Sequence, residues 1–231
     1  MQRLKSLLGA SAALAIGMGV AQAGAINFSQ IITSPISVQV WYGTGTTDLA
    51  APNASPGGQD TASFTYNGPI DFINNNAQGQ SNTFGDFFGA NALGISGFSG
   101  TGNTTLSSFL GATMSVSGSL NPNGYNTFMM LSGTYTANGM TSLTISHDDG
   151  ASFYANGSAI NGLNSPGATS QISNTALLTD GTNVNFDLYY VEANGAPAVL
   201  TAVNAPEPGA LVMFAAGLLA MGWMLRRRKT V

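Results

Sequence analysis

The amino-acid sequence predicts an all-β fold, a sandwich or barrel. Short runs in which apolar and polar residues alternate recur along the chain, roughly ten of them at the 8–12-residue spacing typical of such folds. The chain contains 30 Gly among its 231 residues. Gly adopts positive φ without steric penalty, so we expect turns between these runs. No stretch of the central body shows the 3.6-residue apolar period of an amphipathic helix. We therefore expect antiparallel strands throughout the body.

The predicted strands follow from local patterns. Residues 36–42 alternate cleanly and form the first main strand, in which Trp41 is expected to fill the core. Further strands are expected at residues 64–66, 70–73, 112–117, 128–135, 143–145, 184–191 and 197–203. The segments 43–58, 74–82 and 158–175 are rich in Gly, Asn, Ser and Pro, and are expected to be mostly loop. Residues 84–110 show no clean period and supply core aromatic residues.

Charge is scarce and unevenly distributed. Only 7% of the residues are charged, against about 25% in a typical soluble domain. Of the 10 acidic residues all but Glu207 lie between Ala23 and Pro206, a stretch that contains no Lys or Arg. A body with acids and no bases excludes nucleic-acid binding, which requires phosphate neutralisation. The chain also lacks Cys, which excludes disulfides, thiolate metal sites and a cysteine nucleophile.

The first 23 residues have the pattern of a secretory signal peptide. Arg3 and Lys5 precede an apolar run at 7–20, and Ala21-Gln22-Ala23 matches a small-residue cleavage site. The alternative is an uncleaved anchor helix. The apolar run is short for such a helix, and Ala21 and Ala23 occupy the two small positions of a cleavage site, so this alternative is disfavoured. The mature body is therefore expected to span residues 24–205.

The last segment, residues 206–231, has three parts in a fixed order. Pro206-Glu207-Pro208 is followed by an uncharged run at 209–225 and then by a basic cluster, Arg226, Arg227, Arg228 and Lys229. At ~1.5 Å per residue the run spans about 25 Å, enough for one membrane crossing in a thin bilayer. The basic cluster predicts a cytoplasmic C-terminus. A permanent single-pass anchor is one interpretation.

The order of these parts resembles the PEP-CTERM sorting signal. The resemblance implies recognition near Pro206-Glu207-Pro208 by an exosortase-type membrane transpeptidase, which would remove the helix. The protein would then be held in the inner membrane before processing and lie at the cell surface or in the extracellular matrix afterwards. The resemblance further implies a bacterium that makes exopolysaccharide, with a role in biofilm.

A candidate metal site lies at Asp148-Asp149-Gly150. The alternating residues 143–146 precede it, and Asp149-Gly150 is a hairpin turn signal. Two adjacent carboxylates without a nearby base repel one another and raise each other's pKa unless a cation neutralises them. Hard cations such as calcium take oxygen ligands, so the pair predicts a bound metal. The alternative is that Asp148 caps the turn by accepting backbone N–H bonds.

The same turn, followed by Phe153-Tyr154 and Asn156-Gly157, resembles the Asp-Asp-Gly hairpin of PA14-like domains. Residues 186–200 resemble the closing hairpin of that family. The resemblance implies a PA14-like antiparallel β-sandwich in which a cis peptide joins the two aspartates and calcium bridges them to sugar hydroxyls. It implies a further ligand from Glu192 or Asn194 and does not decide between them. The chain departs from the family at Asn156-Gly157, where many members have Asp-Gly.

Catalysis is not expected. The single His, His147, lies on a strand beside Asp148, and adjacent strand residues point to opposite faces. The chain has no Gly-x-Ser-x-Gly, His-Glu-x-x-His or phosphate-loop motif. Among the aromatic residues Tyr125, next to a turn, is the better candidate for an exposed side chain.

The sequence therefore predicts an exported surface or matrix protein. Its expected role is calcium-assisted binding of carbohydrate, for adhesion to exopolysaccharide. The alternatives are a structural matrix protein without a discrete ligand site and, less favoured, a secreted hydrolase. Saturable binding to a defined glycan would separate the first from the second.

Overall fold

A computed structural model describes residues 26–74, 76–77, 80, 82–116, 124–138, 141–205 and 218. The predicted signal peptide with Ala21 and Ala23, and the sorting residues Pro206, Glu207, Pro208, Arg226, Arg227 and Arg228, lie outside these residues. Within the described ranges, no helix combines the length and the apolar character that a membrane crossing requires.

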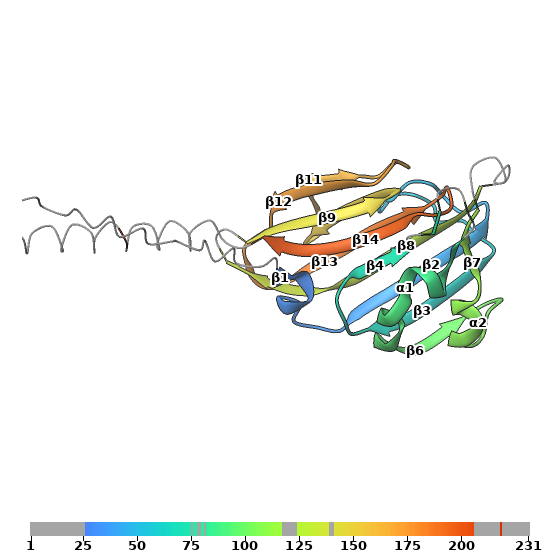
Figure 1. Cartoon of the computed structure of the whole chain (residues 1–231). Helices are drawn as coiled ribbons and strands as arrows, with labels where there is room; N and C mark the ends of the chain where they lie inside the picture. The colour runs from blue at the N-terminus through green and yellow to red at the C-terminus, as the bar shows by residue number, and fades with distance from the viewer. Residues whose placement is uncertain are drawn as a thin grey trace, which may run out of the picture.

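The body is a sandwich of two large antiparallel sheets packed face to face (Figure 1). The seven-stranded sheet has the order β11 (Ser158–Ser165), β10 (Gly150–Ala155), β13 (Gly181–Glu192), β8 (Tyr125–Ala137), β2 (Ile36–Thr44), β3 (Asp60–Tyr66) and β6 (Ile95–Gly100). The five-stranded sheet has the order β1 (Ile26–Asn27), β14 (Ala198–Ala205), β9 (Ser142–Asp148) and β12 (Ile172–Leu177), with β4 (Asp71–Asn74) also paired to β14. A small third sheet joins β5 (Asn82–Thr83) to β7 (Thr113–Ser115). The predicted all-β antiparallel fold is confirmed.

The core lies between the two large sheets and is rich in aromatic rings. Alternate residues of β2 point into it, so Val38 and Val40 are buried while Ser37 and Gln39 are exposed. Phe28 packs edge-on against Phe153 and Phe186 and is fully buried. Each fully buried Phe or Leu contributes about 1.5–3 kcal/mol to folding. Such a core stabilises the body although the chain contains no Cys.

Two short helices, which the sequence pattern did not predict, lie in the segment 84–110. Helices α1 (Phe84–Phe88) and α2 (Leu106–Leu110) begin at capping boxes formed by Thr83 with Asp86 and by Thr105 with Ser108. A 3-10 turn, η2 (Gly89–Gly94), follows α1, and another, η1 (Phe28–Gln30), follows β1 near the start of the body. One turn of helix is too short to show a 3.6-residue period, so the capping pattern was the only available signal. These helices place Phe84, Phe87, Phe88 and Phe109 in the core.

Two further expectations were wrong. Residues 158–175 are not mostly loop, because β11 and most of β12 lie there. Both are edge strands of their sheets with many exposed residues, so polar Ser, Asn and Gly residues suffice and the sequence resembles a loop. Trp41 does not fill the core: it lies on the outer face of β2 with Ser37 and Gln39 and is only half-buried. Tyr125 is half-buried at the start of β8.

We expect Thr83→Ala to lower the free energy of unfolding by about 1 kcal/mol, the usual effect of losing an N-cap. The Thr83 hydroxyl accepts from the Asp86 backbone N–H at 3.1 Å, and the Asp86 carboxylate accepts from the Thr83 N–H at 3.1 Å. Urea unfolding measures the change. Ser158→Ala, at an exposed position of β11, is the control and should stay within about 0.5 kcal/mol of the parent chain. Equal effects of the two substitutions would contradict the capping role.

Candidate functional site

The Asp148-Asp149-Gly150 turn is a corner between the two large sheets. Asp148 ends β9 in the five-stranded sheet, and Gly150 begins β10 in the seven-stranded sheet. The expectation of a hairpin was therefore wrong, since β9 pairs with β12 and β14 while β10 pairs with β11 and β13. The peptide bond between Asp148 and Asp149 is cis, as the family resemblance implies. Gly150 cannot carry a side chain here, because a Cβ would lie 2.3 Å from the Pro166 carbonyl oxygen.

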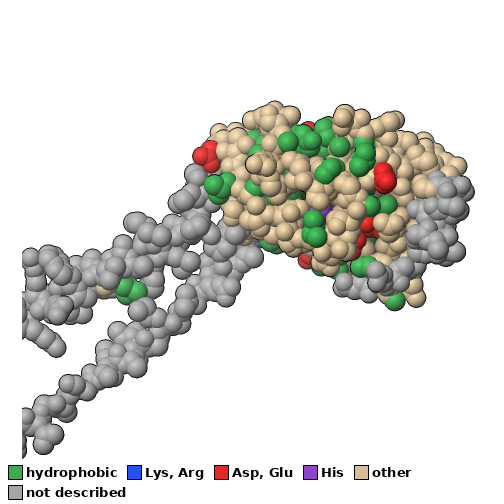
Figure 2. All heavy atoms as spheres, turned by 90° about the horizontal axis from the view of Figure 1, so that it is seen from above, with side chains coloured by type: hydrophobic (Ala, Val, Ile, Leu, Met, Phe, Trp, Pro, Cys, Tyr) green, Lys and Arg blue, Asp and Glu red, His purple; other side chains and the backbone are tan. Residues whose placement is uncertain are grey.

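An open cleft of about 800 Å³ lies at this corner. Both aspartates line it, together with Asn76, the loop residues 168–171 and the residues 194–197 that follow β13. Three separate segments of the chain therefore meet at the aspartate pair. The face of the molecule shown in Figure 2 is mostly uncharged, with few acidic side chains and no basic ones among the coloured residues.

Asp149 is buried and held by neutral donors. Its side chain accepts from the Ala193 backbone N–H at 2.7 Å and from Nδ2 of Asn194 at 3.0 Å. The backbone N–H groups of Asn194 and Thr169 also donate to it. Burial raises the pKa of Asp149, and these donors act in the opposite direction. The carboxylate thus has a fixed position at the base of the cleft.

Asp148 is the more accessible of the two acids. It is half-buried, and burial, followed by the charge of Asp149, raises its pKa to about 6. The backbone N–H of Gln171 donates to it and lowers the pKa in part. The sequence predicted that the two carboxylates would raise each other's pKa; here burial is the larger cause.

The two alternatives for a further ligand are placed differently. Asn194 is exposed, lines the cleft and contacts Asp149 through Nδ2. Its Oδ1 makes no hydrogen bond to any other residue that the structure describes. Glu192 is fully buried, does not line the cleft, and accepts from Ser115 Oγ at 2.9 Å. Burial, and then the charge of Asp149, raises the pKa of Glu192 well above its usual value. Asp148, Asp149 and Asn194 are therefore brought together, and Glu192 lies apart from the cleft.

Oxygen atoms suited to a hard cation are present, although the set is small. Two carboxylates and the Asn194 side-chain amide line one cleft, and calcium accepts carboxylate and amide oxygens, six to eight of them in flexible geometry. Across the described residues, no group of three or more His, Cys, Asp or Glu side chains is arranged to hold a metal ion. A calcium ion at this cleft would take its remaining oxygens from backbone, water or a bound ligand.

Behind the corner lies a buried polar network that sequence reasoning missed. His147 is 1% exposed; its Nδ1 lies 2.6 Å from the Asp149 backbone oxygen, and its Nε2 lies 3.0 Å from Nδ2 of Asn174. An amide nitrogen only donates, so Nε2 accepts and Nδ1 carries the proton. Burial lowers the pKa of His147, in agreement with a neutral ring. His147 is therefore a structural residue, and no signal distinguished it from a polar turn residue.

Residues 204–229 match the family model of the PEP-CTERM protein-sorting motif. The match confirms the sorting signal predicted at 206–231. No characterised protein sequence matches the chain significantly.

Solved structures with a similar fold include two PA14 domains. The PA14 sugar-binding domain from an RTX adhesin is 16% identical, with 76% of this chain and 90% of that chain covered and a TM-score of 0.42. The PA14 domain of the antifreeze protein MpAFP is 13% identical, with 78% and 85% covered and a TM-score of 0.47. A β-glucosidase from Kluyveromyces marxianus in complex with glucose is 19% identical, with 43% and 13% covered and a TM-score of 0.31.

We expect Ser115→Ala to destabilise the corner strongly. The Ser115 hydroxyl donates to Glu192 and accepts from the Gly195 backbone N–H at 3.1 Å. Its removal leaves two buried polar groups unpaired at ~1–3 kcal/mol each, so the free energy of unfolding should fall by about 2–4 kcal/mol. Chemical denaturation measures the loss. Ser173→Ala, which removes a hydroxyl from the exposed Ser146–Ser173 pair, is the matched control. A similar small effect of both substitutions would show that the hydrogen bonds of Ser115 to Glu192 and Gly195 contribute little to the free energy of unfolding.

Proposed function

We propose that this exported surface protein binds carbohydrate through a calcium ion held in the cleft by Asp148, Asp149 and Asn194. The observation that carries the proposal is the meeting of two carboxylates and the Asn194 side-chain amide at one open cleft, in a body without a single Lys or Arg. The sorting motif at 204–229 supports export and delivery to the cell surface or matrix, with exosortase-type processing at the inner membrane.

A cation at this position has a clear electrostatic basis. Asp148 and Asp149 are both partly or fully removed from water, and an isolated buried carboxylate is costly unless it is paired or neutralised. The chain offers no basic side chain between residues 24 and 205, so neutralisation must come from protonation or from a bound cation. A site with two carboxylates binds calcium more tightly than a site with one, because the affinity rises with the number of charged oxygen ligands.

The cleft also suits a hydroxyl-rich ligand. The loop residues Thr169, Ser170 and Gln171 line it beside Asp148 and offer hydroxyl, amide and backbone groups. A calcium ion whose protein ligands are incomplete has free coordination positions for two hydroxyl oxygens of one sugar ring. The bound ion would thus fix the sugar, and the neutral loop would supply hydrogen bonds that select among sugars. In the matrix such binding would attach the protein to exopolysaccharide, which is the basis for a role in adhesion and biofilm.

We expect calcium to raise the melting temperature of the full chain relative to a chelator. A ligand that binds only the folded state stabilises it by ~2.7 kcal/mol at a hundredfold excess over its dissociation constant. The measurement is a thermal melt in a detergent without a sugar head group. The double variant Asp148→Asn with Asp149→Asn should lose the calcium response, whereas Asp48→Asn with Asp180→Asn, which removes the same charge at exposed positions, should keep it. A parent chain that does not respond to calcium would overturn the mechanism and favour a matrix protein without a ligand site.

A second prediction separates the two alternative ligands. We expect Asn194→Ala to weaken the calcium response by about tenfold in affinity, which corresponds to ~1.4 kcal/mol, because it removes an oxygen at the cleft. Glu192→Gln should keep the response, since Glu192 faces Ser115 and Tyr190 instead. Calcium titration by isothermal calorimetry measures both. Loss of binding in Glu192→Gln alone would assign the ligand to Glu192.

A further inference from the structure

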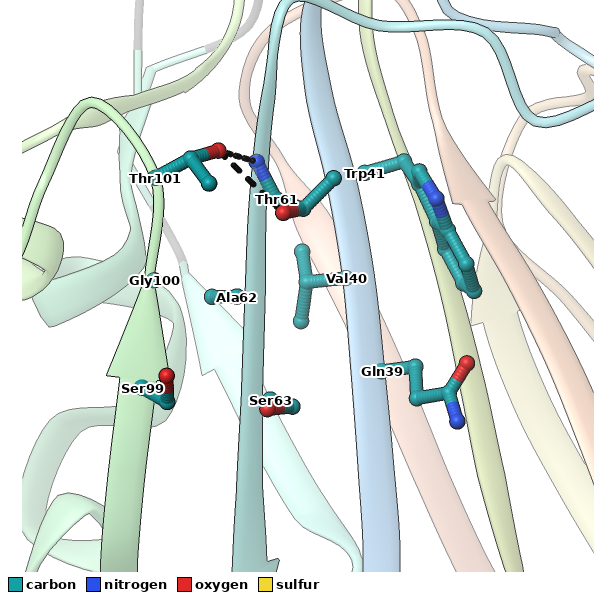
Figure 3. Close-up of a pocket in the computed structure, with 9 residues that line it drawn as sticks. All are labelled: Gln39, Val40, Trp41, Thr61, Ala62, Ser63, Ser99, Gly100 and Thr101. Atoms are coloured by element: carbon teal, nitrogen blue, oxygen red, sulfur yellow. Dashed lines mark hydrogen bonds between the residues drawn. The ribbon is translucent and has the colours of Figure 1, made fainter.

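A second groove lies on the outer face of the seven-stranded sheet, away from the aspartate corner. It has a volume of about 370 Å³ and crosses β2, β3 and β6 (Figure 3). Strands β10 and β3 are four places apart in the sheet order, which corresponds to about 20 Å at ~4.8 Å per strand. The groove is therefore separate from the cleft that contains the Asp148–Asp149 pair.

Trp41 forms one side of this groove. In Figure 3 its indole ring stands beside the Gln39 amide, with Ser99 on the far side of the groove. The ring packs edge-on against Phe128 at a centroid distance of 5.7 Å. Phe128 and Tyr189 belong to the same outer cluster and are buried there with Ala50, a residue of the loop that connects β2 to β3. Trp41 is the half-exposed end of this cluster, and so presents aromatic surface to the groove.

The rest of the groove is a row of neutral polar side chains. Gln39 pairs with Ser63 across β2 and β3, and Ser63 pairs with Ser99 across β3 and β6. The row spans about 10 Å at ~4.8 Å per strand. All three residues are exposed, and none makes a side-chain hydrogen bond to another residue in the described ranges. Their donors and acceptors are available to a ligand.

One end of the groove is rigid. The Thr61 backbone N–H donates to Thr101 Oγ1 at 2.9 Å, and the Thr101 backbone N–H donates to the Thr61 oxygen at 2.8 Å. The two threonine hydroxyls lie 3.2 Å apart. These bonds, drawn in part as dashed lines in Figure 3, tie the turn after β6 to β3. The groove is consequently preformed, which reduces the entropy lost on binding.

The chemistry of the lining selects the class of ligand. No lining residue is charged, so the groove offers no attraction to phosphate, to nucleic acid or to an acidic or basic peptide. A protein partner would be expected to bury an apolar centre, and the groove has only one large apolar side chain. A neutral sugar chain presents hydroxyl groups to polar side chains and C–H faces to an aromatic ring, which matches both parts of the lining.

We infer that this groove binds an uncharged polysaccharide segment, independently of calcium, with Trp41 stacking on a sugar ring and the row Gln39, Ser63 and Ser99 bonding to hydroxyls. A segment that lies across the strands meets the three polar residues in turn. The groove and the cleft at Asp148 and Asp149 have no lining residue in common. The chain would thus have two carbohydrate-binding surfaces of different cation dependence.

Affinity electrophoresis of the full chain tests the inference. Each gel contains one neutral polymer, namely hydroxyethylcellulose, galactomannan or dextran, or alginate as a charged comparison. The buffer contains a chelator, which removes calcium, and a detergent without a sugar head group. The parent chain should be retarded by at least one neutral polymer and not by alginate. Trp41→Ala and Ser63→Glu should each weaken retardation at least about tenfold, as for the loss of an interface anchor, and Trp41→Phe should retain part of it. Ser158→Glu carries the same added charge at an exposed position of β11 and should be retarded like the parent.

Several outcomes would overturn the inference. One is a parent chain that no neutral polymer retards in chelator; another is unchanged retardation in both Trp41→Ala and Ser63→Glu. Ser63→Glu keeps the test valid if Trp41→Ala unfolds, since Ser63 is exposed. A dimer in sedimentation experiments that Ser63→Glu dissociates would assign the groove to a second copy of the chain. The double variant at Asp148 and Asp149 should keep calcium-independent retardation, so failure of one site does not imply failure of the other.

Discussion

The absence of basic residues from the body governs how this protein buries its acids. Asp149 is 2% exposed and Glu192 is fully buried, and no Lys or Arg between residues 24 and 205 can pair with either. Neutral donors take that role: backbone N–H groups and Asn194 for Asp149, and the Ser115 hydroxyl for Glu192. Such donors are weaker than an ion pair and must be held in place. The corner is therefore built around hydrogen bonds whose donors come from distant parts of the chain.

The same bonds connect the two sheets. The hydroxyl of Tyr190, on β13 of the seven-stranded sheet, lies 2.5 Å from the backbone oxygen of Asp148, which ends β9 of the five-stranded sheet. That hydroxyl also lies 3.1 Å from Oε2 of Glu192. One hydroxyl carries one proton, so if Tyr190 donates to the shorter contact, a protonated Glu192 can donate to the Tyr190 oxygen. The raised pKa of Glu192 favours that form. Glu192 thus supports the corner as a fully buried hydrogen-bonding group that does not line the cleft.

The sequence predicted what depends on strong local patterns. Alternation identified β2 and β9, and the adjacent carboxylates singled out Asp148 and Asp149, because both signals are carried by neighbouring residues. The sequence predicted a hairpin at this pair, and the corner between the two sheets depends on pairing with remote strands. Strand β12 and the burial of His147 depend on pairing and packing with remote segments, and a single sequence contains no record of those contacts. Trp41 is different: strict alternation already assigned it to the face of Ser37 and Gln39. The general preference of Trp for the core predicted a buried Trp41, which was wrong, whereas the two-residue period of the strand predicted the outer face correctly.

A surface with little charge limits the ways in which this protein can select its partners. Without basic residues the body has no long-range attraction for anionic polymers. Under the two proposals, contact would depend on short-range groups: a cation held by Asp148 and Asp149, or an aromatic ring beside neutral hydroxyls. The two proposed surfaces would respond differently to calcium in the medium, because only the first would need the ion to bind a sugar. They lie on one rigid sandwich about 20 Å apart by strand spacing. A polymer that engaged both would gain from the high effective concentration of the second site, and weak individual contacts would then suffice to keep the protein in the matrix.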